Sequence, residues 1–137
     1  MKDFEFYIDK DSVKRQSKDL NLAKATARES LDRINMARSI LSTQKPKYIL
    51  ENAYEAVREF IDAILYSEGF KSYSHEASVA YLSKLGFNVS KINDIDRLRR
   101  LRNNIKYYGG DATLEEAKEA LKIAEDMIKQ LKEKKKF

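Results

Sequence analysis

Cysteine is absent from this chain of 137 residues, proline occurs once, histidine once and glycine four times. Without cysteine there are no disulfides, thiolate metal sites or cysteine nucleophiles, and a single histidine, His75, cannot build a multi-histidine metal site. So few helix breakers favour a handful of long helices joined by short loops over a β-sandwich, which needs many turns. We therefore expect an all-α domain without metal or cofactor.

Long apolar runs are also missing. No stretch approaches the roughly 18 residues that cross a bilayer, and residues 1–5 lack the apolar centre of a signal peptide. The length suits one domain with its own core. We expect a cytoplasmic protein with no membrane contact. It divides into an N-terminal arm over residues 1–11, a helical bundle over residues 12–133 and a basic tail over residues 134–137.

The formal net charge of +5 is unevenly distributed. Residues 90–110 carry six positive and two negative side chains, and residues 129–137 carry five positive and one negative. Two basic clusters on a mildly acidic body favour a polyanionic partner. Lysines near a helix C-terminus also offset the helix dipole and keep a protein soluble. We favour that second interpretation for the C-terminal cluster.

Apolar side chains at steps of three and four residues predict four long helices and one short one. Asp11 or Ser12 could cap the first helix, and Thr113 with Glu116 forms a capping box for the last. Short loops make neighbours antiparallel, which predicts an up-and-down bundle. Residues 4–8 are too few for a sheet and are expected to form an arm on the bundle or on a partner subunit. The next helix is expected over residues 46–69, with Pro46 in its first turn and Gly69 at its end. The remaining helices are expected over residues 74–86 and over residues 90–109, where Ser90 opens the helix.

Arg102 falls within the apolar stripe of the helix predicted over residues 90–109. A buried guanidinium needs a partner to offset its desolvation. One interpretation, slightly favoured, is a structural ion pair with a carboxylate of the preceding long helix, namely Glu55, Glu59 or Asp62. The other is that Arg102 lines a cleft and binds phosphate, whose oxygens match the guanidinium fork.

Two tyrosines, Tyr107 and Tyr108, close the same helix beside two glycines. They could be packing residues, or they could stack on a base or donate a hydrogen bond to a phosphate. Arg97, Arg99 and Arg100 could form a solvated face that pairs with nearby aspartates along the helix. The sequence leaves both questions open.

Two stretches, GFKSYSHE at residues 69–76 and LRRLRNNIKYYG at residues 98–109, resemble the HEPN domain family. The resemblance implies a small prokaryotic helical bundle that usually dimerises and often stands beside a minimal nucleotidyltransferase. Active members of the family cleave RNA without metal. Their motif is an arginine, commonly a polar residue after it, and a histidine four to six residues further on. In this chain Arg102 matches the arginine and Asn103 the polar residue, but Tyr107 stands where the histidine is expected.

That departure affects the chemistry, because a tyrosine with an ordinary pKa near 10 is a poor base at pH 7. Five residues on a regular helix also place Arg102 and Tyr107 about 140° apart. They could share a site if the helix ends near Tyr107 or if two subunits meet there. His75 and Glu76 are expected to act locally, in capping or packing at the start of the short helix.

Three hypotheses follow. In the first, the chain is a dimeric domain that binds nucleotide or RNA phosphates and acts with a nucleotidyltransferase partner in a toxin–antitoxin-like pair. Arg99, Lys106 and Tyr108 would then contact phosphates. In the second, it is a metal-independent endoribonuclease that uses Arg102, Asn103 and Tyr107. In the third, it is a structural bundle in which Arg102 is merely paired. The missing histidine favours the first.

Overall fold

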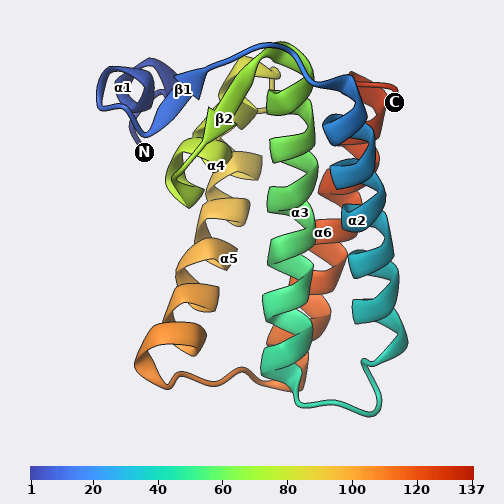
Figure 1. Cartoon of the computed structure of the whole chain (residues 1–137). Coiled ribbons are helices and arrows are strands. Elements are labelled where there is room, and N and C mark those ends of the chain that lie inside the picture. The colour runs from blue at the N-terminus through green and yellow to red at the C-terminus, as the bar shows by residue number, and fades with distance from the viewer.

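The computed structural model describes residues 1–137 and shows four long helices in an antiparallel bundle (Figure 1). The prediction of an all-α bundle with four long helices and one short one is confirmed, with one further short helix at the N-terminus. No helix combines the length and apolar content that crossing a membrane requires. The long helices are α2 (Leu20–Ser39), α3 (Pro46–Glu68), α5 (Val89–Tyr108) and α6 (Leu114–Lys134), and the short ones are α1 (Phe4–Asp9) and α4 (His75–Lys84).

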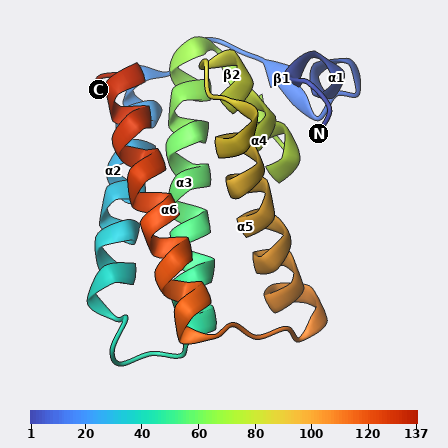
Figure 2. The ribbon, with the colours of Figure 1, turned by 180° about the vertical axis from the view of Figure 1, so that it is seen from behind.

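Helix α3 is the centre of the bundle. Thirteen of its 23 residues are buried, more than one amphipathic face can supply, because α2 and α6 cover one side while α4 and α5 cover another. Figure 2 shows α3 behind α6, between α2 and α5. Its fully buried side chains include Tyr54 and Phe60. Polar residues of α3 that face these neighbours must therefore find partners inside the protein.

The predicted helix ends are largely confirmed. Pro46 occupies the first turn of α3, and Gly69 ends that helix in the left-handed conformation. Thr113 and Glu116 form the expected capping box at the start of α6. Asn88 rather than Ser90 caps α5, by accepting a hydrogen bond from the amide of Lys91.

The N-terminal region differs from the prediction. Residues 4–9 form helix α1, and strand β1 (Val13–Arg15) pairs antiparallel with strand β2 (Phe70–Ser72). The expectation that Asp11 or Ser12 starts the first long helix is wrong, because Asp19 caps α2. The pairing partner of β1 follows α3 in the sequence, so periodicity within the first 20 residues could not reveal it. Phe4 is buried against the rings of Phe70 and Tyr81.

Gly69 and Gly109 both have positive φ angles, of 87° and 69°. A Cβ atom at Gly69 would lie 2.8 Å from the backbone oxygen of Gln16, whereas one at Gly109 meets nothing within 4 Å. We expect Gly109→Ala to lower the free energy of unfolding by about 1–2 kcal/mol, the cost of the left-handed conformation alone. Gly69→Ala should lose a further 1–3 kcal/mol, roughly, from overpacking. Urea unfolding of both variants measures the difference, and equal losses would contradict the close approach of Gln16.

Candidate functional site

Arg102 is buried in an ion pair. Only 5% of the residue is exposed, and its Nη2 atom lies 2.8 Å from Oε1 of Glu55 on α3. Of the three carboxylates considered as partners, Glu59 pairs instead with Arg33 of α2, and Asp62 pairs with Arg58. The structural ion pair predicted from the sequence is therefore confirmed, with Glu55 as the partner.

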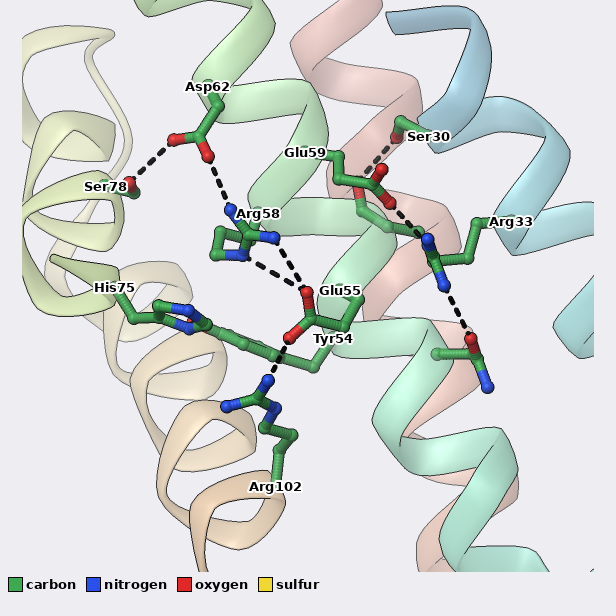
Figure 3. A network of polar contacts seen from close by, with 12 residues as sticks. Ser30, Arg33, Tyr54, Glu55, Arg58, Glu59, Asp62, His75, Ser78 and Arg102 are labelled. Carbon is green, nitrogen blue, oxygen red and sulfur yellow. Dashed lines mark hydrogen bonds and ion pairs between the residues drawn. The ribbon is translucent and has the colours of Figure 1, made fainter. Parts of the chain in front are cut away.

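Arg58 links Glu55 to a network of ion pairs and hydrogen bonds that connects α3, α4 and α5 (Figure 3). Its guanidinium lies 2.8 Å from Oε2 of Glu55 and 2.6 Å from Oδ2 of Asp62. The Ser78 hydroxyl on α4 donates a 2.7 Å hydrogen bond to the other oxygen of Asp62. We call these five residues, Glu55, Arg58, Asp62, Ser78 and Arg102, the polar seam. It joins the central helix to both neighbours on this side.

Arg102 is the least satisfied member of the polar seam. Its Nε atom is buried without a hydrogen-bond partner, and Nη1 donates a 3.2 Å bond to the side chain of Asn103. Oε1 of Glu55 also accepts no hydrogen bond, so the short contact between the two side chains is electrostatic and not directional. Asn103 thus orients the guanidinium from the following position in the helix.

The charge states of the two carboxylates follow from their surroundings. Burial raises the pKa of Asp62 to about 6, although Arg58 and Ser78 act in the opposite direction. Burial also acts to raise the pKa of Glu55, but Arg58 and Arg102 together bring it below its usual value. Both groups are therefore ionised at pH 7, and the polar seam has two negative and two positive charges.

His75 lies beside the polar seam but does not replace the missing motif histidine. Its ring stacks on Tyr54, with centroids 5.8 Å apart, and the Tyr54 hydroxyl lies 3.1 Å from Nδ1. Burial lowers the His75 pKa to about 4, and the charges of Arg58, Arg102 and Arg99 act in the same direction. The ring is neutral at pH 7, and Tyr54 engages one of its nitrogens. This agrees with the packing role expected from the sequence.

The end of α5 carries the exposed part of the predicted site. Tyr107 is 63% exposed and Tyr108 81% exposed, so neither packs in the core. The helix stops at Gly109, and the Tyr107 ring centre lies 5.8 Å from the guanidinium carbon of Arg102 and 5.9 Å from Nζ of Lys106. Arg102 and Tyr107 are therefore neighbours within one chain, which satisfies the first of the two geometric conditions for a shared site. We call Lys106, Tyr107 and Tyr108 the tyrosine end.

Arg99, predicted to contact phosphate, faces a different set of side chains. It pairs with Asp96 at 2.8 Å and approaches Glu76 of α4 at 3.6 Å. Asp96 also pairs with Arg100, whereas Arg97 pairs with Glu119 on α6. Arg99 lies one turn before Arg102 in α5, and the carboxylates of Asp96 and Glu76 already match its charge. The structure brings Arg102, Asn103, Lys106 and Tyr107 together and leaves Arg99 outside this group.

Comparison with known proteins agrees with this architecture. A family model for the HEPN domain matches residues 23–134, which include all four long helices apart from the first turn of α2. The chain belongs to the HEPN domain family. HEPN domains commonly dimerise, and many bind or cleave RNA. No curated protein matches this HEPN chain.

Sequence reasoning missed Arg58 and Ser78 in the polar seam of this HEPN domain, although it named Arg102 and included Glu55 and Asp62 among the possible partners. Glu55, Arg58 and Asp62 follow one another at steps of three and four residues, so they share one face of α3. That spacing was the signal in the sequence from which the pairing of Arg58 with both carboxylates could have been predicted. The contribution of Ser78 and the stacking of His75 on Tyr54 depend on how α4 packs against α3, which no local pattern specifies.

The lowered pKa of His75 predicts a pH-dependent stability. Between pH 6.5 and about 4 the unfolded chain binds a proton at this ring that the folded chain does not, so the free energy of unfolding falls as the pH is lowered. Since the ring is only partly buried, we expect a loss of about 1 kcal/mol across this window. His75→Gln should remove that part of the pH dependence.

Denaturant unfolding of the wild type and of His75→Gln at several pH values measures this effect. Asp62 acts oppositely, since its folded carboxyl takes up a proton between about pH 6 and its ordinary 3.8. Its contribution is present in both proteins and cancels in the difference between them. Parallel stability curves for the two proteins would show that His75 has an ordinary pKa.

Proposed function

We propose that this HEPN domain binds single-stranded RNA or nucleotides at the tyrosine end, as a homodimer that acts with a nucleotidyltransferase partner in a toxin–antitoxin-like pair. The observation that carries the proposal is the exposure of Tyr107 and Tyr108 beside Lys106. A folded chain that leaves two adjacent tyrosines in solvent presents aromatic surface that a nucleobase can cover.

The chemistry of the tyrosine end suits nucleic acid without sequence preference. Exposed aromatic rings stack on bases of any identity, and a neighbouring lysine attracts the phosphate backbone. Tyr48 and Lys47, in the first turn of α3, add a further exposed tyrosine and a lysine over its ring. They lie at the same end of the bundle, because α3 and α5 are antiparallel and the Glu55–Arg102 pair fixes their relative height.

Arg102 and Asn103 support this surface from behind. The guanidinium lies under the Tyr107 ring and is held by Glu55 and Asn103, so it positions the ring and contributes positive potential close to it. Arg99 is not part of the proposed contact surface, because Asp96 and Glu76 already match its charge.

Binding without cleavage is the better-supported of the two RNA functions. Cleavage without metal needs a group that exchanges a proton near pH 7. Tyr107 stands at the position where the motif of RNA-cleaving HEPN domains has its histidine. His75 has its pKa lowered to about 4, and the buried Tyr54 engages its Nδ1 atom. His75 therefore has neither the pKa nor the free geometry of an efficient acid–base catalyst.

The dimer and the nucleotidyltransferase partner rest on membership of the HEPN family. Sedimentation equilibrium of the purified chain tests the first, with a mass of twice 16.0 kDa expected. Co-expression with a minimal nucleotidyltransferase encoded by a neighbouring gene tests the second, with copurification expected. A monomer across the micromolar range would remove the dimer from the proposal and leave RNA binding to be tested separately.

The sharpest test of RNA binding is the paired substitution Tyr107→Ala and Tyr108→Ala. Removing two stacking rings should weaken binding of a fluorescent single-stranded RNA at least tenfold, roughly, as measured by fluorescence anisotropy in EDTA. Tyr73→Ala is the matched control. Tyr73 is 62% exposed and has Lys71 5.3 Å from its ring centre, but it follows β2 at the other end of the bundle. Its substitution should leave RNA affinity unchanged.

The same assay separates the alternatives. Lys106→Glu should weaken RNA binding. It should also reduce the slope of the logarithm of affinity against the logarithm of salt concentration by about one. Equal effects of the Tyr73 and Tyr107/Tyr108 substitutions, or no RNA binding at all, would contradict the proposal. RNA cleavage that persists in EDTA and disappears in Arg102→Ala would show an endoribonuclease instead.

A further inference from the structure

A groove of about 520 Å³ lies between α2 and α6, near the C-terminal end of α6. It exists because α2 and α6 both pack mainly on α3 and only slightly on one another. The floor between them is Phe60 of α3, and the walls include Ile34 of α2 and Ile128 of α6. The groove is therefore apolar at its base, and its volume is within the range of small-molecule sites.

The groove already holds an apolar side chain. The ring of Phe137 meets the ring of Phe60 edge-on, with centroids 5.9 Å apart, and is 40% exposed. Phe137 belongs to residues 135–137, which follow α6 without regular secondary structure. The floor of the groove thus accepts the apolar ring of Phe137, which lies outside α6. An apolar group of a ligand can compete with this ring for the same position.

The rim of the groove is basic. Lys129, Lys132, Lys135 and Lys136 all line it, and none of them takes part in a salt bridge. Two acidic residues also line it. Glu125 is engaged by Arg38 of α2, which leaves Glu133 as the acid without a salt-bridge partner. The rim therefore carries an excess of positive charge over an apolar floor.

We propose that this groove binds a free amphiphilic carboxylate, with its aliphatic chain on Phe60 and its head group among the four lysines. Apolar burial supplies attraction without direction, and the lysines select the sign of the head group. Phe137 competes for the same floor. The C-terminal lysines thereby gain a role beyond offsetting the helix dipole. The groove is remote from the tyrosine end, which lies at the opposite end of the bundle (Figure 1), so the two proposals are independent.

Isothermal titration calorimetry with dodecanoate, kept below its micelle concentration, tests the site. We expect one dodecanoate per chain, and binding of dodecyltrimethylammonium, which has the same chain and the opposite charge, about tenfold weaker or worse. Phe137→Ala should tighten dodecanoate binding, because it removes the competing ring. Circular dichroism of each variant checks that the helices are intact.

The lysines are tested by charge reversal with a matched control on the same helix. Lys129→Glu with Lys132→Glu should weaken dodecanoate binding at least tenfold, roughly. Lys118→Glu with Lys122→Glu changes the net charge equally on exposed positions of α6 outside the groove and should have little effect. Equal loss in both double variants, equal binding of the two head groups, or no binding of dodecanoate would overturn the proposal. If the protein adsorbed to phosphatidylglycerol vesicles but did not bind dodecanoate, the proposal would be wrong and the four lysines would form only a basic surface.

Discussion

The ion pairs of Arg58 are the interaction on which the arrangement of α3, α4 and α5 depends. Arg58 lies between Glu55 and Asp62 on the central helix and pairs with both, while Arg102 supplies the second positive charge. Each carboxylate then uses its second oxygen on another helix, Glu55 toward Arg102 of α5 and Asp62 toward Ser78 of α4. Without Arg58, two carboxylates would be largely buried with too little positive charge to match them, which is strongly unfavourable.

This constraint sets the position of α5. Little of that helix is apolar, and its buried side includes Asp96 and Arg102 among the aliphatic residues. Apolar packing alone would leave its register along α3 weakly specified, whereas the pair between Arg102 and Glu55 fixes one height and one rotation. Tyr107 and Tyr108 follow Ile105, a buried residue near the end of α5, and lie in solvent. The exposed surface proposed to bind RNA is thus a consequence of the buried pair behind it.

The central helix also determines the second proposed site. Over its middle turns, the seam-facing side of α3 carries charge toward α4 and α5. In the same turns, the opposite side of α3 presents Phe60 between α2 and α6. Both α2 and α6 pack on α3 in preference to each other, and a groove remains between them. Both proposed sites therefore arise from one feature, a helix that is buried over most of its surface.

The sequence by itself determined the helices, because their apolar spacing, caps and glycine stops are local: Pro46, Gly69 and the Thr113–Glu116 box all act as predicted. It also narrowed the partner of Arg102 to three carboxylates of α3. Only the tertiary structure decided that Glu55 is that partner, since Arg33 and Arg58 engage the other two. The pairing of β1 with β2, the stacking of His75 on Tyr54 and the groove over Phe60 were likewise decided in three dimensions. Each joins residues far apart in the chain, and local periodicity carries no information about which distant side chain fills a given space.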